Sequence, residues 1–295
     1  MIYTETNTER MNIMVKIISD STCDLCPELL EKYDISILPL HILLGEEEYE
    51  DGLDITIEEI YAWADAHKDT PKTSAPSIDR AIEVFEPYVK KGNEIVCFSI
   101  SGSMSASGNI MRMAAEQLDA EDSIHVIDSQ NLSTGIGLLV VEAAAMAKEG
   151  KTAGEIVLRM EELIPRVRAS FVVDTLVYLH RGGRCSGLAA MAGSALKLHP
   201  RIEVVDGAMQ SGKKYRGSID KVIMSYVKDM EEALKAADQT RVFITHSGCH
   251  RDIVEQVREY LNDLGVFSEI WETRAGGVVS SHCGPGTLGV LFIAS

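Results

Sequence analysis

Short apolar runs alternate with helix-forming segments throughout the first half of the chain. Runs at Met14–Ser19, Glu94–Ser99 and Ser123–Asp128 have the length of buried strands. Helix-forming segments follow them at Glu28–Tyr33, Asn109–Leu118 and Ile136–Lys148. Strands that alternate with helices at this spacing indicate a parallel sheet wound by crossover helices. The sequence therefore predicts an α/β fold whose first part is a parallel, doubly wound α/β domain.

Hydroxyl-rich loops follow three of these predicted strands, after Ser19, Ser99 and Asp128. In parallel α/β sheets, ligands bind beyond the carboxyl ends of the strands. Two further hydroxyls, Thr73 and Ser74, come shortly before Ser77, which we expect to cap a helix that begins near residue 78. The sequence thus predicts a polar mouth at one edge of the sheet.

A predicted helix at Thr152–Ile164 ends at Pro165, where the charge balance also changes. We place a domain boundary there, giving domains at 14–165 and 166–295 and an N-terminal extension at 1–13. Strands are fewer per helix beyond the boundary and a hairpin turn is expected near residue 206, so we expect an α+β sandwich. Its predicted strands are Ala169–Val173, Arg201–Asp206, Arg241–Thr245 and Phe267–Glu272, and its predicted helices are Ser186–Leu196, Ser218–Ala237 and Asp252–Leu264.

Charge is distributed unevenly between the two parts. Residues 1–165 carry 12 Lys and Arg against 31 Asp and Glu, whereas residues 166–295 carry 16 against 14. The net charge of −17 argues against nucleic-acid binding, which needs a basic surface. Basic residues of the second part, among them Arg181, Arg184, Lys197 and Arg201, form either a solvated face or a docking surface for a partner.

The chain has the features expected of a cytoplasmic protein. It contains no apolar run of transmembrane length, and its first residues lack the apolar core of a signal peptide. Its six cysteines are scattered, which favours free thiols over a disulfide framework.

A glycine-rich stretch surrounds His282 near the C-terminus. Gly276 and Gly277 would let backbone N–H groups approach a ligand closely, and Gly284 begins a Gly-Pro-Gly turn that would fix the histidine. One interpretation is the wall of a binding pocket. The other is a tight loop before the last buried strand, with His282 in a structural role.

Several catalytic and metal-binding patterns are incomplete. The loop at 102–108 has Met104 and Ala106 where a nucleophile elbow needs serine and glycine. Cys23 and Cys26 have thioredoxin-like spacing, but no other feature supports a redox role. The segment 246–250 contains two histidines and a cysteine, which a strand-to-helix turn explains better than a zinc site. We therefore expect no metal and no cofactor.

The remaining polar candidates are neutral hydrogen-bond donors. They are Thr73, Ser74, Ser101, Ser105 and His282. Such groups can hold a carboxylate without acting on it chemically. The alternative is a hydrolase or transferase that uses Ser, His and Cys of the same loops on a small molecule.

Several short motifs occur in order along the chain: Asp20-Ser-Thr, Thr73-Ser-Ala-Pro-Ser77, the Ser101–Ser107 loop, Asp128-Ser129, Arg181-Gly-Gly-Arg184 and His282-Cys-Gly-Pro-Gly286. With these motifs the sequence resembles the DegV family of bacterial fatty-acid-binding proteins, from about Met14 to Ser295. The resemblance implies a parallel α/β domain and an α/β domain with a mainly antiparallel sheet, which hold a long acyl chain between them.

The resemblance also implies a role and a set of contacts. The protein would be a carrier in phospholipid metabolism, not an enzyme, and would present the fatty-acid carboxyl group to a separate fatty acid kinase. Transient contact with a membrane is compatible with that role. Thr73 and Ser74, a serine of the 101–107 loop and His282 would hold the carboxylate. The loop is one residue longer than the family pattern, so both Ser101 and Ser105 are candidates.

Overall fold

The structure is a computed structural model and describes residues 14–186 and 198–295. Its first sheet is parallel, as the sequence predicts, with the strand order β2-β1-β6-β7. Ile18 in the middle of this sheet pairs with Ser36 on one side and Cys97 on the other. The strands are β1 (Val15–Asp20), β2 (Ser36–Leu38), β6 (Glu94–Ser99) and β7 (Ile124–Asp128).

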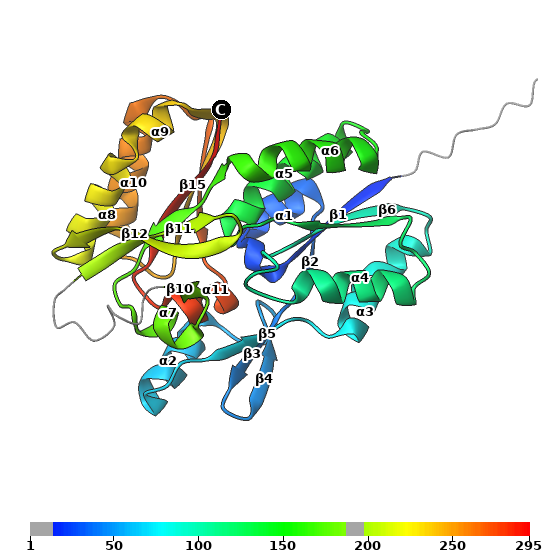
Figure 1. The fold of residues 1–295 in the computed structure, drawn as a ribbon, viewed down its shortest axis with the longest axis horizontal. Coiled ribbons are helices and arrows are strands. Elements are labelled where there is room, and N and C mark those ends of the chain that lie inside the picture. Colours follow the sequence, from blue (N-terminus) through cyan, green and yellow to red (C-terminus); the bar gives the residue numbers. More distant parts are fainter. Residues whose placement is uncertain (1–13, 187–197) are drawn as a thin grey trace, which may run out of the picture.

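Helices cover both faces of this sheet, which confirms the doubly wound arrangement (Figure 1). One face is covered by α3 (Ile78–Val89) and α4 (Ser107–Gln117), whose Phe85 and Met111 are fully buried. The other face is covered by α1 (Pro27–Tyr33), α5 (Thr134–Lys148) and α6 (Ala153–Leu163).

The second sheet is mainly antiparallel, with the order β10-β12-β11-β9-β15-β13-β14 and β8 paired to β15. In the described residues its parallel pairs are β10 with β12 and β13 with β14. The strands are β8 (Val167–Arg168), β9 (Ser170–Val172), β10 (Cys185–Ser186), β11 (Leu198–Val205), β12 (Ala208–Arg216), β13 (Ala237–His246), β14 (Glu269–Arg274) and β15 (Leu288–Ala294).

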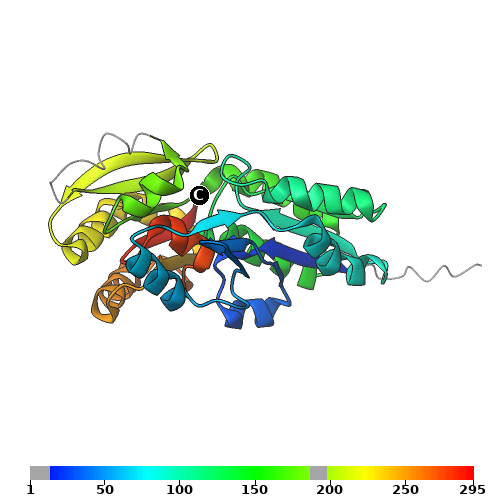
Figure 2. The ribbon, with the colours of Figure 1, turned by 90° about the horizontal axis from the view of Figure 1, so that it is seen from below.

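The two faces of the second sheet have different covers (Figures 1 and 2). Helices α8 (Ile219–Asp229), α9 (Glu231–Lys235) and α10 (Arg251–Leu264) close one face around a core that contains Tyr226. The other face packs against α5, and one apolar cluster joins that helix to Phe171, Phe243 and Leu291. Helix α5 is therefore buried between the two sheets, and this accounts for its nearly continuous apolar sequence.

A third, small sheet with the order β4-β3-β5 was not expected. The apolar run at Ile35–Leu44 is divided at Pro39 into β2 and β3 (His41–Leu44), because proline cannot donate to a strand ladder. The acidic residues that follow form β4 (Glu47–Glu50), and Thr73 lies in β5 (Lys72–Ser74). Helix α2 (Ile57–His67) joins β4 to β5.

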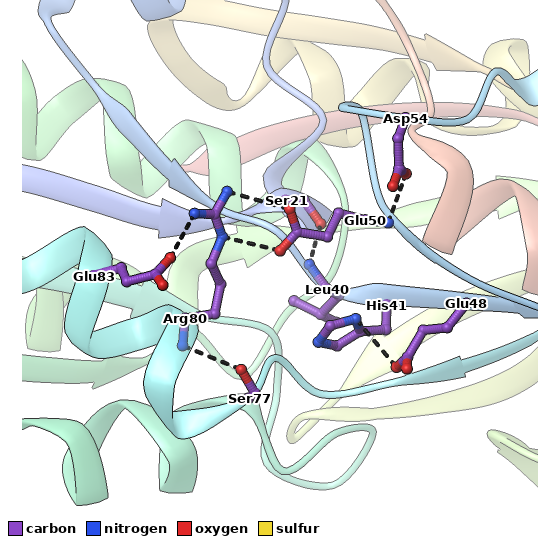
Figure 3. Close-up of polar contacts among 9 residues, drawn as sticks. All are labelled: Ser21, Leu40, His41, Glu48, Glu50, Asp54, Ser77, Arg80 and Glu83. Atoms are coloured by element: carbon purple, nitrogen blue, oxygen red, sulfur yellow. Dashed lines mark hydrogen bonds and ion pairs between the residues drawn. The ribbon is translucent and has the colours of Figure 1, made fainter.

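An arginine ties the small sheet to the parallel domain. The Arg80 guanidinium on α3 forms ion pairs with Glu50 at 2.9 Å and with Glu83 at 3.0 Å (Figure 3). The Arg80 amide donates to the Ser77 hydroxyl at 3.1 Å, so the predicted helix cap is confirmed. These contacts fix β4 and, through β3, the strand that carries Thr73.

Other expected elements change in the second half. The helix predicted at Ser218–Ala237 is interrupted at Met230, between α8 and α9. The helix predicted at Ser186–Leu196 lies outside the described residues, except for Ser186 at the end of β10. A short helix α7 (Val177–Gly182) precedes β10, and the glycine-rich stretch, for which a tight loop was one of two interpretations, forms helix α11 (Gly277–Cys283). Within residues 14–186 and 198–295, no helix is long and apolar enough to cross a membrane.

Candidate functional site

A cavity of about 240 Å³ lies between the two sheets, beneath α11 and next to the carboxyl ends of β6 and β7. Most of its wall is apolar, and its polar groups come from β5, from the loop after β6, from α11 and from Arg184, which precedes β10. The lining residues are Leu40, Thr73, Ser74, Ala75, Ile100, Met104, Ser105, Ala106, Leu132, Arg184, Met209, Val278, Val279, His282 and Cys283. An apolar space with a few polar groups at one end suits an amphipathic ligand.

Thr73 and His282 meet at the polar end of the cavity, although 209 positions separate them in the sequence. The Thr73 Oγ1 atom lies 2.8 Å from His282 Nε2. β5 brings Thr73 to this place through its pairing with Ile42 on β3, and α11 brings the histidine. Ser74 also lines the cavity. The structure thus brings together three of the predicted binding residues.

The His282 ring is neutral at physiological pH. Burial lowers the pKa of His282 to about 4, and the positive charge of Arg184 acts in the same direction. The ring also packs directly on α7, since a Cβ atom added at Gly182 would lie 2.4 Å from His282 Nδ1. In the described part of the chain, Nδ1 has no hydrogen-bond partner. The His282 ring can therefore form hydrogen bonds, but it does not add a positive charge to that of Arg184.

The serine loop after β6 contributes Ser105 to the cavity wall, whereas Ser101 is not among the lining residues. Ser101 is buried, and its hydroxyl lies 3.2 Å from the Ser103 hydroxyl. The buried Asp20 carboxyl group fixes the loop, because it accepts from the Ile100 amide and from the Ser107 hydroxyl, both at 2.8 Å. Of the two serines that the sequence left open, Ser105 has the better access to a ligand.

The glycine N–H groups that we expected to face a ligand have internal partners instead. The amide of Gly276 donates to Asp24 and the amide of Gly277 donates to Asp51, each at 2.8 Å. The Gly284 amide closes α11 by donating to the Ser280 carbonyl. The two bonds to the aspartates form because the first amides of a helix have no acceptors within the helix.

The basic residues grouped as partner-facing do not share one surface. Arg184 lines the cavity, and Arg181 on α7 donates to the Lys68 carbonyl at the end of α2. Arg201 lies on the other face of the second sheet, where it pairs with Glu203 at 2.8 Å and its guanidinium lies 5.8 Å from the Tyr226 ring on α8. Strand alternation explains this separation of Arg201 from Arg184, since Ile202 takes the inward face. Lys197 lies outside the described residues.

The alternative chemistries find little support in the side-chain arrangement. Cys23 and Cys26 are free thiols, and burial raises the pKa of Cys23 to about 12, the reverse of an activated thiol. His246 pairs with Glu272, and the Cys249 thiol donates to the Thr287 carbonyl. Among residues 14–186 and 198–295, no cluster of three or more His, Cys, Asp or Glu could hold a metal ion.

Sequence reasoning missed most of the apolar wall. Ile100 and Leu132 follow the ends of β6 and β7, so the rule that ligands bind beyond parallel strands could have identified them. Met209 and Val278 come from elements that pack between the two halves of the chain, and no local sequence pattern reveals this packing.

The parallel sheet, the mainly antiparallel sheet and the small third sheet surround a mostly apolar cavity, and together they define an α/β protein with an internal cavity. The family model described as "Uncharacterised protein, DegV family" matches residues 14–295. The chain therefore belongs to the DegV family.

Relatives and solved structures agree with this assignment. A DegV domain-containing protein of Clostridium acetobutylicum is 32% identical over 281 residues, covering 95% of this chain and 98% of the relative. A stearic acid-binding protein from Eubacterium ventriosum is 31% identical with a TM-score of 0.83, covering 95% of this chain and 98% of that one. A DegV family protein from Thermus thermophilus, described for its fatty acid binding, is 26% identical with a TM-score of 0.86, covering 96% and 100%.

Proposed function

We propose that this protein binds a long-chain fatty acid in the cavity between its sheets, with the carboxylate at the Thr73–His282 end and the acyl chain along the apolar wall. The observation that carries this proposal is the mostly apolar cavity whose polar groups include the neutral Thr73–His282 pair and the basic residue Arg184. Ser74 and Ser105 supply further hydroxyls to the carboxylate. Descriptions of two structural relatives as fatty-acid-binding proteins support the choice of ligand.

The acyl chain supplies most of the binding free energy. Burial of each methylene contributes about 0.8 kcal/mol, so a long chain gains roughly 10 kcal/mol before the costs of association. Hydrogen bonds to the charged headgroup contribute about 1.5 to 3 kcal/mol each. A headgroup variant should therefore bind the ligand more weakly but still detectably.

The change Thr73→Val tests the headgroup assignment, because it removes the hydroxyl and keeps the shape of the side chain. We expect about a tenfold or larger rise in the Kd for palmitate by isothermal titration calorimetry, since one charge-assisted hydrogen bond is lost. The control is Thr240→Val, at an exposed position of β13. Equal palmitate affinities of the Thr73 variant and the wild type would contradict the headgroup assignment. Native mass spectrometry that finds no lipid on the wild type would contradict the choice of a fatty acid as the ligand.

We propose further that the protein is a carrier, not an enzyme, and that it presents the bound carboxyl group to a separate fatty acid kinase. A hydrolase triad would need a third group to orient the histidine. Across the described residues, His282 Nδ1 has no partner that could do so. The neutral donors around the cavity also suit holding a carboxylate better than attacking one.

Arg181 and Arg184 are the basic residues that lie near the cavity, so we place the kinase-docking face there. Exposed charges act mainly on encounter rates. The variant Arg181→Glu, at a residue that does not line the cavity, should bind palmitate but slow acyl-phosphate formation by the kinase, most strongly at low salt. Arg201→Glu, on the other face of the second sheet, is the matched control. Unchanged phosphorylation of the Arg181 variant at every salt concentration would exclude this face.

A further inference from the structure

Helix α11 carries His282, but it cannot position that residue by itself. It is only seven residues long, and such short helices are not stable alone in water. Gly276 at its N-cap has no side chain that could accept from the first amides. The orientation of the helix must therefore be set by groups outside it.

Two carboxyl groups of the first half supply the missing acceptors. Asp24 Oδ1 accepts from the Gly276 amide, and Asp51 Oδ1 accepts from the Gly277 amide, both at 2.8 Å. Asp24 follows the short 3₁₀ helix η1 (Ser21–Cys23), and Asp51 follows β4. Both side chains are buried, at 5% and 4% exposure, so they are shielded from competing water.

The second oxygen of each carboxyl group is fixed in turn. The Ser133 hydroxyl donates to Asp24 Oδ2 at 2.6 Å. The Ser21 hydroxyl donates to Asp51 Oδ2 at 2.8 Å and accepts from the Leu40 amide at 3.2 Å, a contact drawn in Figure 3. Each carboxyl group thus connects α11 to a defined point of the parallel domain.

Close packing removes the remaining freedom at both ends of the helix. A Cβ atom at Gly277 would lie 2.6 Å from the Ile42 side chain and 2.8 Å from that of Ile60. At the other end, Gly182 leaves just enough room for the His282 ring. A shift of α11 toward either neighbour would cause a clash, and a shift away would break the bonds to the aspartates.

We propose that Asp24 and Asp51 are positioning residues, which hold the N-terminus of α11 so that His282 Nε2 meets the Thr73 hydroxyl. Their role in ligand binding rests on the proposed function. His282 then acts through Thr73. Because a buried N–H without an acceptor is costlier than a buried lone pair, the ring proton lies on Nε2 and is donated to Thr73. The hydroxyl proton of Thr73 is left to donate to the ligand carboxylate.

The test compares Asp51→Ala with Asp51→Asn. Asparagine keeps an acceptor oxygen for the Gly277 amide, whereas alanine removes it. We expect Asp51→Ala to raise the Kd for palmitate about tenfold, as the loss of one hydrogen bond at the headgroup would, and Asp51→Asn to restore binding. The matched control is Asp229→Ala, which removes the partner of Lys213 and Tyr215 on the far side of the second sheet.

Nitrogen-15 NMR of the ligand-free protein gives a readout that a general loss of stability would not change. The wild type and Asp51→Asn should show one His282 tautomer, protonated at Nε2, and Asp51→Ala should show exchange between tautomers. If Asp51→Ala does not fold, Ser21→Ala replaces it as a milder change, because it removes only the hydroxyl that donates to Asp51 Oδ2. An unchanged tautomer and affinity in the folded variant would overturn the proposal. Altered tautomers in a protein that binds no palmitate would keep the positioning role and reject the proposed ligand.

Discussion

Burial disfavours the charged forms of three ionisable residues in and around α11, namely His282, Asp24 and Asp51. His282 is neutral because burial lowers its pKa to about 4. Burial raises the pKa of Asp24 to about 8 and raises the pKa of Asp51 as well. Nearby negative charges of Asp51 and Asp20 add to the effect on Asp24. Because Asp24 holds its proton at neutral pH, it adds little negative charge that could repel a ligand carboxylate.

The raised pKa of Asp24 predicts a pH dependence of stability. Between about pH 4 and pH 8 the folded protein retains a proton on Asp24 that the unfolded chain has released. The free energy of unfolding therefore falls as pH rises through this window and becomes level above it. The variant Asp24→Asn lacks this contribution, while the opposite contribution of His282 is common to both proteins.

Urea denaturation at pH values from 5 to 9 measures this effect. The stability of the wild type minus that of Asp24→Asn should decrease steadily up to about pH 8. A constant difference over the whole range would show that Asp24 titrates normally in the folded protein.

At the scale of single elements, regular strands and helices were the most predictable part. Strand β6 has the predicted bounds, and α5 begins two residues before the predicted helix. Local periodicity determines such elements because each one buries an apolar face. A tight loop was one of two interpretations of the glycine-rich stretch. Glycine disfavours helices, but tertiary contacts override this preference in α11.

The candidate site was predictable in part for a similar reason. Thr73, Ser74, Ser105 and His282 belong to short motifs, so they could be found without a structure. Asp24 could not, since its role depends on a contact with Gly276, 252 positions away. The separation of Arg201 from Arg184 likewise depends on which face of a strand each residue occupies.

Helix α11 also separates two cavities. A second cavity of about 20 Å³ lies beyond the first, and Leu132, Val279 and Cys283 line both. Truncation of a shared residue should join the cavities and admit a longer acyl chain. We expect Val279→Ala to shift the preference in competition binding toward longer saturated acids, by about fourfold for each additional buried methylene.

A matched variant separates this effect from a general loss of packing. Val254→Ala on α10 removes the same methyl groups from the other core of the second sheet. It should lower stability without changing the chain-length preference. If both variants and the wild type prefer the same chain length, Val279 does not limit the length of the acyl chain that the cavity accepts.

At the scale of the whole molecule, the two sheets share one apolar cluster through α5. The boundary at residue 165 therefore separates the two sheets along the sequence but cuts through a common core. We expect the full chain to unfold in a single calorimetric transition, and residues 14–165 alone to expose α5 and bind the dye ANS. Two separate transitions, or a soluble first part that binds no dye, would support two independent domains.

The contact between the serine loop and the second sheet has a kinetic consequence. The Ser103 hydroxyl donates to the Gly207 carbonyl in the turn between β11 and β12, and the same two segments line the cavity through Met104 and Met209. A ligand that passed between them would have to wait for this bond to break. Because such an opening would slow entry and release equally, it would lengthen the residence time of a ligand without changing its equilibrium affinity.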